Sequence, residues 1–208
     1  METNVLLQIF RAFHSGCQVN SQFYAVGGAT GSILCVEFYD PHKSGWTWLK
    51  KNVPRMMYNF TTSGCNSKLI LIGSGQSSSV FLQCYNPAID QWTVVRSPNV
   101  PRHLSAPVSA TLADESKIFV SGDNTKKLYA FDPNKNSWSR AADMNNLHSN
   151  GNLVLLGNEL FHTGGHWEED GYWDEMESYD IAQNTWNPRG ALPHLWLYHG
   201  CAAIFINE

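Results

Sequence analysis

The sequence predicts an all-β fold of repeated four-stranded sheets, stacked as the blades of a β-propeller. An aromatic residue followed by Asp or Asn recurs four times, each time with a Trp seven residues after the aromatic. The four tryptophans are separated by 46, 46 and 48 residues, a period typical of repeat proteins. Short apolar runs bounded by turn residues fill each period, and none has a sustained helical pattern.

The recurring register joins two predicted strands through a turn. Its four copies are Tyr39 with Trp46, Tyr85 with Trp92, Phe131 with Trp138, and Tyr179 with Trp186. The Asp or Asn after the aromatic favours a turn because its side chain bonds its own backbone, and the Pro that follows in three copies fixes φ. The rings are large enough to contribute about 2–3 kcal/mol each when they are covered by a neighbouring sheet.

Each period is predicted to hold four antiparallel strands, A to D. Strand C leads into the aromatic residue and strand D carries the Trp. Strand B is a β-branched and aromatic run, and strand A lies upstream of it. The B runs cover 23–26, 68–72, 117–120 and 160–163, and the A runs cover 13–19, 59–65, 108–112 and 153–156.

Glycines close strand B, where the backbones of a propeller crowd and a residue without Cβ tolerates close approach and positive φ. These positions are Gly27, Gly28, Gly73, Gly75, Gly122, Gly164 and Gly165.

Taken together, this order of motifs resembles the Kelch repeat over residues ~12–200. The chain departs from the pattern in the second repeat, which has Gly-Ser-Gly at 73–75, and in the third, which has Ser-Gly-Asp at 121–123 and Phe131 for Tyr. The fourth repeat lacks Pro after Asp180. The resemblance implies a Kelch-type β-propeller, with one repeat domain over 1–208. The expected repeats run over about 12–54, 55–101, 102–146 and 147–193, with the start of a fifth at 194–208.

The repeat count predicts a partial or small propeller. Kelch propellers usually close with about five to seven blades, whereas this chain has four repeats and the expected opening strand of a fifth at 199–206. We interpret the sequence as a fragment, an isoform or a partial propeller.

Composition excludes several classes of protein. The net charge of −4 gives no general affinity for nucleic acid. No apolar stretch is long enough for a membrane span, and Met1–Phe10 has no basic start of a signal peptide. Of the five cysteines, Cys17, Cys65 and Cys201 are expected at equivalent strand-A places as buried thiols. This pattern suits a reducing compartment, so the expected location is the cytoplasm, with the cytoskeleton or the nucleus as alternatives.

The loops carry the candidate binding residues. The longest B–C loop, 166–175, interleaves acids with aromatics and is either a contact surface for a basic partner or a solvated acidic loop. By analogy with Kelch propellers, the loops between strand D and the next strand A share a face with the B–C loops, and Arg55, Arg102, His148 and His194 could ring a pocket mouth there. Alternatively, Pro-Arg is only the turn chemistry of the repeat. The predicted partner-binding residues are Arg55, Tyr58, Arg102, His103, Asn124, His148, Trp167, Glu168, Glu169, Trp173, His194 and Tyr198.

No catalytic or metal motif is recognised, and no cofactor is expected. His162 and His166 share a strand face, but no third metal ligand stands at a recognised spacing. The N-glycosylation motif at Asn59 lies in a predicted strand. The resemblance to Kelch proteins implies a non-catalytic module that binds a protein or peptide. It suggests substrate recognition for a cullin-RING ubiquitin ligase adaptor, with cullin-3 bound by other domains. The alternatives are an actin-associated scaffold, or an enzyme of the galactose oxidase or specifier-protein type.

Overall fold

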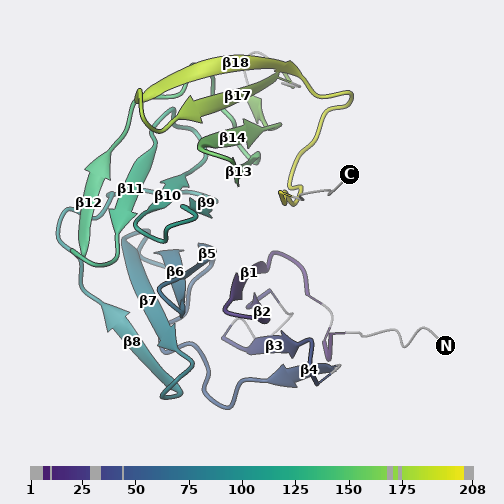
Figure 1. Cartoon of the computed structure of the whole chain (residues 1–208), viewed down its shortest axis with the longest axis vertical. Helices are drawn as coiled ribbons and strands as arrows, with labels where there is room; N and C mark the ends of the chain where they lie inside the picture. Colours follow the sequence, from purple (N-terminus) through teal and green to yellow (C-terminus); the bar gives the residue numbers. More distant parts are fainter. Residues whose placement is uncertain are drawn as a thin grey trace. The chain divides into compact units, whose positions relative to one another are not determined.

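The computed structural model describes residues 7–9, 11–28, 34–43, 45–167, 171–172 and 175–203. The regular structure of this part of the chain consists of β-strands (Figure 1). The chain divides into two compact units, 1–103 and 104–208, and each contains two four-stranded antiparallel sheets. The units are described separately.

In the first unit, the strands of each sheet follow one another in sequence order. The first sheet comprises β1 (Ser15–Val19), β2 (Gln22–Val26), β3 (Val36–Asp40) and β4 (Gly45–Trp48). The second comprises β5 (Asn59–Cys65), β6 (Lys68–Ser74), β7 (Val80–Asn86) and β8 (Gln91–Val95). The four strands of each sheet are the predicted strands A to D.

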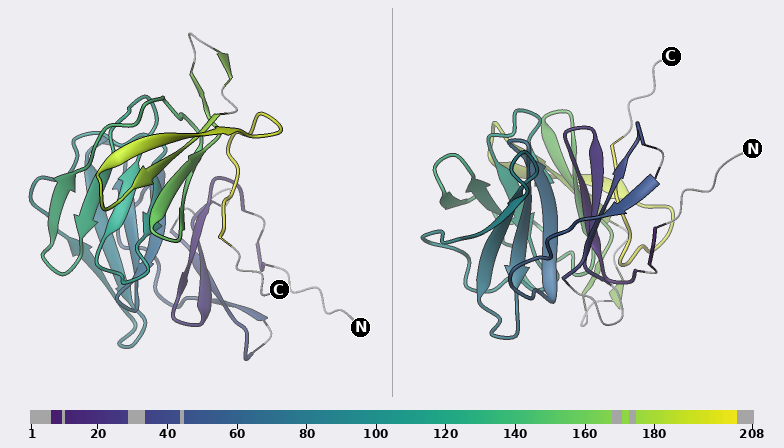
Figure 2. Two further views of the ribbon diagram at one scale, coloured as in Figure 1. Left: turned by 45° about the horizontal axis from the view of Figure 1, so that its top comes forward. Right: turned by 90° about the horizontal axis from the view of Figure 1, so that it is seen from below.

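The second unit repeats this arrangement. Its first sheet comprises β9 (Val108–Thr111), β10 (Ile118–Ser121), β11 (Tyr129–Asp132) and β12 (Ser137–Arg140). Its second comprises β13 (Asn152–Leu156), β14 (Glu159–Thr163), β17 (Glu175–Asp180) and β18 (Thr185–Ala191). A small hairpin of β15 (His166–Trp167) and β16 (Gly171–Tyr172) stands out from the end of β14 (Figure 2).

The aromatic-to-Trp register is a cross-strand pair in all four sheets. Each aromatic residue of strand C lies directly opposite the Trp of strand D. The ring centroids are 5.7, 5.1, 5.0 and 5.4 Å apart in chain order, with tilted planes. Such offset aromatic contacts stabilise paired strands beyond the area that they bury. The seven-residue spacing in the sequence therefore reflects a short turn, after which strand D pairs with strand C of the same sheet.

In each sheet, the Asp or Asn after the aromatic residue forms the predicted turn with its own side chain. The carboxylate of Asp40 accepts the N–H of His42, and Asn86 accepts that of Ala88. Asp132 and Asp180 accept the N–H groups of the residues two and three positions later. These side chains accept hydrogen bonds from backbone N–H groups, which in a tight turn have no backbone acceptor.

The phenol of the aromatic residue also closes the turn. Tyr85 donates to Oδ1 of Asp90 at 2.9 Å, and Tyr179 donates to Oδ1 of Asn184 at 2.8 Å. Both acceptors adopt positive φ, five residues after the Tyr. The third repeat has Phe131 instead and has no such bond to make.

We expect Tyr85→Phe to lower the free energy of unfolding by about 1 kcal/mol, because it removes this hydrogen bond and keeps the ring. Urea denaturation of the wild type and the variant measures the loss. Phe131→Leu is a useful contrast, because it removes a ring that makes no phenol hydrogen bond. Its loss of unfolding free energy should come from packing alone. An unchanged midpoint for Tyr85→Phe would show that the phenol bond does not stabilise the turn.

Each unit has its core between its two sheets. In the first unit, Val26 and Val36 pack with Leu69, Leu71 and Tyr85 of the second sheet. In the second unit, Phe119 packs against Tyr179 with ring centroids 5.7 Å apart, and Leu128, Leu153 and Leu160 join the same cluster. A single four-stranded sheet cannot bury both of its faces, so pairing of neighbouring sheets supplies the core.

The glycines at the end of strand B do two different things. Gly28 and Gly165 have φ of 77° and 105°, in the region that favours glycine. A Cβ would also be crowded at both positions, 2.5 Å from the carbonyl oxygen of Ala12 at Gly28 and 2.8 Å from the carbonyl carbon of His148 at Gly165. In the second repeat the requirement is space alone, because a Cβ on Gly73 would lie 2.0 Å from the carbonyl oxygen of Asn59 and Gly73 has no positive φ.

Two details differ from the sequence expectations. Counted from the two-residue hairpin turns, Cys65 matches Val19 and Cys17 matches Ser63, so Cys17 and Cys65 do not occupy equivalent places. The described part of the expected fifth-blade strand, 199–203, is not a strand. Individual hydrogen bonds hold that segment instead. For example, the side-chain amide of Asn152 donates to the carbonyl of His199 at 2.6 Å. Residues 204–206 lie outside the described residues.

Candidate functional site

A pocket of about 540 Å³ lies in the second sheet of the first unit. It is formed where strand A begins, strand C begins and strand D ends. Two basic side chains, Arg55 and Arg96, line it together with a largely aliphatic wall. The wall consists of Val80, Phe81, Leu82, Val94, Val95, Ser97 and Val100.

The backbone of Arg55 is fixed by a buried amide. The N–H of Arg55 donates to Oε1 of Gln83, and Nε2 of Gln83 donates to the carbonyl of Arg55, both at 2.8 Å. Gln83 has no exposed surface. A buried amide that both donates and accepts holds the loop as a sheet partner would. The loop before β5 is therefore rigid at the residue that faces the pocket.

The guanidinium of Arg55 is stacked and charged. Its central carbon lies 4.4 Å from the centroid of the Phe81 ring. Within the described part of the chain, no carboxylate forms an ion pair with it. A guanidinium held on an aromatic face keeps its donors for an incoming carboxylate or phosphate. The pocket can therefore bind an anionic group with apolar neighbours.

The position of Gln83 is a recurrent anchor that the sequence analysis missed. It lies two residues before the strand-C aromatic, and the equivalent residues are Glu37, Tyr129 and Glu177. Glu37 and Glu177 are as buried as Gln83, with 0% and 1% exposure. Each of the three polar side chains binds the segment that precedes strand A of its own sheet. A polar residue at this offset in three of four repeats was the available signal.

In the first sheet the anchor is an ion pair. Nη2 of Arg11 lies 2.7 Å from Oε1 of Glu37, and both side chains are fully buried. The N–H of Gln8 donates to Oε2 of Glu37 at 2.7 Å. Arg11 also donates to the carbonyls of Gly27 and Cys35, so its charge is surrounded by acceptors.

In the last sheet the anchor Glu177 contacts His148, which was predicted to lie at a pocket mouth. That prediction was wrong. His148 is only 4% exposed, so it is not available at a pocket mouth. Its Nδ1 lies 2.8 Å from the carbonyl of Gly164 and its Nε2 lies 3.0 Å from Oε1 of Glu177. Both neighbours are hydrogen-bond acceptors, so the two ring nitrogens of His148 lie between strand B and strand C of the same sheet.

Several donors keep Glu177 ionised. Burial raises the pKa of Glu177, but the bonds from His148 and from the N–H groups of Asn145 and Asn146 outweigh it and hold the pKa below its ordinary value. The segment before β13 is thereby tied to strand C by a charged cluster rather than by the neutral amide of the second sheet.

A second histidine is stacked on this cluster. The rings of His148 and His162 are 4.5 Å apart at their centroids. Nε2 of His162 lies 3.1 Å from the hydroxyl of Ser121, and the side chain is 2% exposed. Burial, followed by the charges of His148 and His199, holds the pKa of His162 well below 6.5. His162 is therefore neutral in the folded chain at pH 7.

The other predicted binding residues are distributed over both units. Tyr58, Arg102 and His103 are exposed in the first unit. Asn124, His194 and Tyr198 are exposed in the second, where the N–H of Asn124 donates to the hydroxyl of Ser149. Because Arg55 and Arg102 belong to one unit and His194 to the other, a shared ring of these side chains stays a prediction.

The long B–C loop lies largely outside the described residues. Trp167 is the end of β15, but its side chain is not described. Glu168, Glu169 and Trp173 fall outside the described residues, so the contact surface expected there remains a prediction.

Within the described ranges, no group of three His, Cys, Asp or Glu residues is placed to hold a metal ion. The same residues contain no helix with the length and hydropathy needed to cross a membrane. All five cysteines are thiols, and burial raises the pKa of Cys17 to about 12 despite a bond from Thr62. A thiol of that kind is a poor nucleophile and metal ligand.

Comparisons with known proteins agree with the repeat pattern. No protein-family model matches the chain. The solved structure of YjhT is similar over 90% of this chain and 73% of that one, with a TM-score of 0.71 and 16% sequence identity, which supports the fold alone. Kelch-like protein 30 from Homo sapiens is 42% identical over 95% of this chain, and the protein of the same name from Mus musculus is 40% identical over the same share. The chain belongs to the Kelch-like family.

Membership of the Kelch-like family confirms the predicted Kelch-type β-propeller fold. Kelch-like protein 21 from Bos taurus is a further relative, 31% identical over 61% of this chain and 21% of its own length. The chain spans about a third of the length of the Kelch-like protein 30 sequences, 34% in each.

Proposed function

We propose that this Kelch-repeat chain is a non-catalytic recognition module that binds an acidic segment of a partner protein at Arg55. The observation that carries the proposal is the pocket in which the Arg55 guanidinium lies on Phe81 without an internal carboxylate partner among the described residues. The relationship to Kelch-like proteins supports a role in protein interaction.

The chemistry of the pocket defines the ligand. Arg55 and Arg96 supply positive charge, and Val80, Val95 and Val100 supply an apolar wall. An Asp or Glu side chain, or a phosphorylated one, would pair with the guanidinium, and an adjacent aliphatic residue would cover the valines. Since Gln83 fixes the Arg55 backbone, little loop ordering is needed on binding.

We further propose that the partner is a substrate of a cullin-RING ubiquitin ligase. In this arrangement cullin-3 would be recruited through a BTB domain outside these 208 residues, and the β-sheets would select the substrate in the cytoplasm. The support is the relationship to Kelch-like proteins. Capture of actin in place of ubiquitylated proteins would favour the cytoskeletal alternative.

Arg55→Glu is expected to weaken binding of acidic peptides by about 10- to 100-fold, because it removes a charged hydrogen bond and adds repulsion. A library of acetylated peptides with Glu, Asp or phosphoserine beside Val or Leu would be screened against the purified chain. Fluorescence anisotropy of the best peptide then gives Kd for each variant.

Lys68→Glu is the matched control for this experiment. It makes the same change of charge at an exposed residue at the start of β6, at the other end of the sheet. Equal Kd values for Arg55→Glu and the wild type, or equal weakening by Lys68→Glu, would contradict a site at Arg55.

A further inference from the structure

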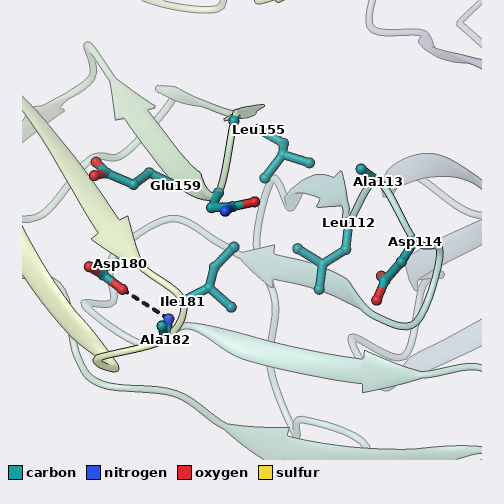
Figure 3. Close-up of a pocket in the computed structure, with 10 residues that line it drawn as sticks. Leu112, Ala113, Asp114, Leu155, Glu159, Asp180, Ile181 and Ala182 are labelled. Atoms are coloured by element: carbon teal, nitrogen blue, oxygen red, sulfur yellow. Dashed lines mark hydrogen bonds between the residues drawn. The ribbon is translucent and has the colours of Figure 1, made fainter.

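A second pocket, of about 490 Å³, lies in the second unit (Figure 3). It is formed by the A–B turns of both sheets and by the turn between β17 and β18. These are the opposite strand ends from those that form the Arg55 pocket in the first unit. The second pocket is therefore a separate feature of the fold.

The middle of this pocket is apolar. Leu112, Leu155 and Ile181 project toward its centre from three different turns (Figure 3). All three are only partly buried and lie at the margin of the core of the second unit. Their exposed surface would gain from contact with an aliphatic group of a ligand.

The rim is acidic. Asp114 lies on one side, and Glu159 and Asp180 lie on the other (Figure 3). None of the ten lining residues is basic. The bond from the N–H of Ser116 is the main cause that lowers the pKa of Asp114, and the bond from Ser178 does the same for Glu159. Both carboxylates are therefore ionised at neutral pH.

The nearby positive groups do not cancel this charge. Arg189 forms an ion pair with Glu159 at 2.5 Å. The charge of Lys117 helps to lower the pKa of Asp114, but these two residues form no ion pair among the described residues. Asp180 uses Oδ1 for the N–H groups of Ala182 and Gln183. Asp114 and Asp180 thus line the pocket on opposite sides, and neither forms an ion pair within the described part of the chain.

We propose that this pocket binds a lysine or arginine side chain, together with an aliphatic neighbour, from a basic segment of a partner protein. The stem of such a side chain is apolar and its head is cationic, which matches an apolar centre below an acidic rim. The charge complementarity is opposite to that of the Arg55 pocket, so the two sites would select different segments.

The test removes the charge and keeps the turns. Asp114→Asn and Asp180→Asn retain the side-chain oxygen that accepts the turn N–H, and Asn86 already fills the place of Asp180 in the second repeat. Fluorescein-labelled peptides with a central Arg or Lys between Leu, Ile or Ala residues serve as probes, each paired with a Gln-substituted peptide. Anisotropy on the whole chain gives Kd.

The basic peptides should bind the wild type more tightly than their Gln counterparts. The double variant should bind them about tenfold more weakly, and added salt should weaken wild-type binding. Ala182→Trp, which fills the pocket from its wall, should also reduce binding. Asp132→Asn makes the same change in the turn of the preceding sheet and should leave Kd unchanged.

Any of the following results would overturn the proposal: no preference for Arg or Lys over Gln, unchanged Kd in the double variant, or equal weakening by Asp132→Asn. Arg55→Glu is measured on the same probes, and tighter binding by that variant would place the basic peptides at the other pocket, because the change replaces a positive charge with a negative one. That result also counts against the proposal.

Discussion

Arg11→Met is expected to lower the free energy of unfolding by about 3–5 kcal/mol, because it leaves the buried Glu37 carboxylate without its counter-ion. Among the described residues three donors reach this carboxylate, and two of them are lost with the guanidinium. Guanidinium chloride denaturation followed by Trp fluorescence measures the change.

A double variant separates the charge from the packing. Glu37→Gln introduces the neutral amide that the second sheet has at Gln83. Combined with Arg11→Met, it should lose less stability than Arg11→Met alone, and the difference is the coupling between the two residues. Arg140→Met is the matched control, since its pair with Asp143 is half exposed and should contribute much less. A loss for Arg11→Met no larger than the control would contradict a structural ion pair.

Stability is expected to fall as the pH drops below about 6.5, because His162 stays neutral in the folded chain. In the unfolded chain its pKa returns to about 6.5, so below that pH the unfolded state binds one more proton. The unfolded state is then favoured, by up to about 1.4 kcal/mol per pH unit, until the folded pKa is reached. The groups that face His162 are His148, with its partner Glu177, and His199.

His162→Gln tests this dependence. It removes the titrating ring while keeping a polar group for Ser121, so its stability should change less between pH 7 and pH 5 than that of the wild type. His42→Gln, on the exposed turn between β3 and β4, is the matched control and should keep the wild-type slope. Urea midpoints at half-unit pH intervals give both slopes. A slope in His162→Gln as steep as that of the wild type would assign the effect to another group.

Much of the fold could be predicted from the sequence because its signals are local. The run 59–65 was predicted as a strand and is β5, and the pairing of Tyr85 with Trp92 follows from a spacing that one short turn can span. Turn chemistry at Asp40 or Asn86 is likewise set by the residue and its nearest neighbours.

The burial of polar residues could not be predicted in the same way. Glu37, Gln83 and Glu177 lie in strands whose pattern favours an outward polar side chain, and they are buried because a segment distant in sequence supplies donors. His148 belongs to such a segment, so its loop position alone wrongly indicated exposure. The Gly-Cys pairs at Cys17 and Cys65 looked equivalent, although the hairpin register shifts one by two residues.

Reversing the charge of Arg55 and of the partner's acidic residue tests recognition at Arg55 most directly. Proteins captured by the wild-type chain, by Arg55→Glu and by Lys68→Glu would be identified by mass spectrometry, and the acidic residue of a captured partner would then be changed to Arg. We predict that Arg55→Glu loses the partner, that Lys68→Glu keeps it, and that the altered partner binds Arg55→Glu but not the wild type. Capture of the same proteins by all three chains would contradict the account.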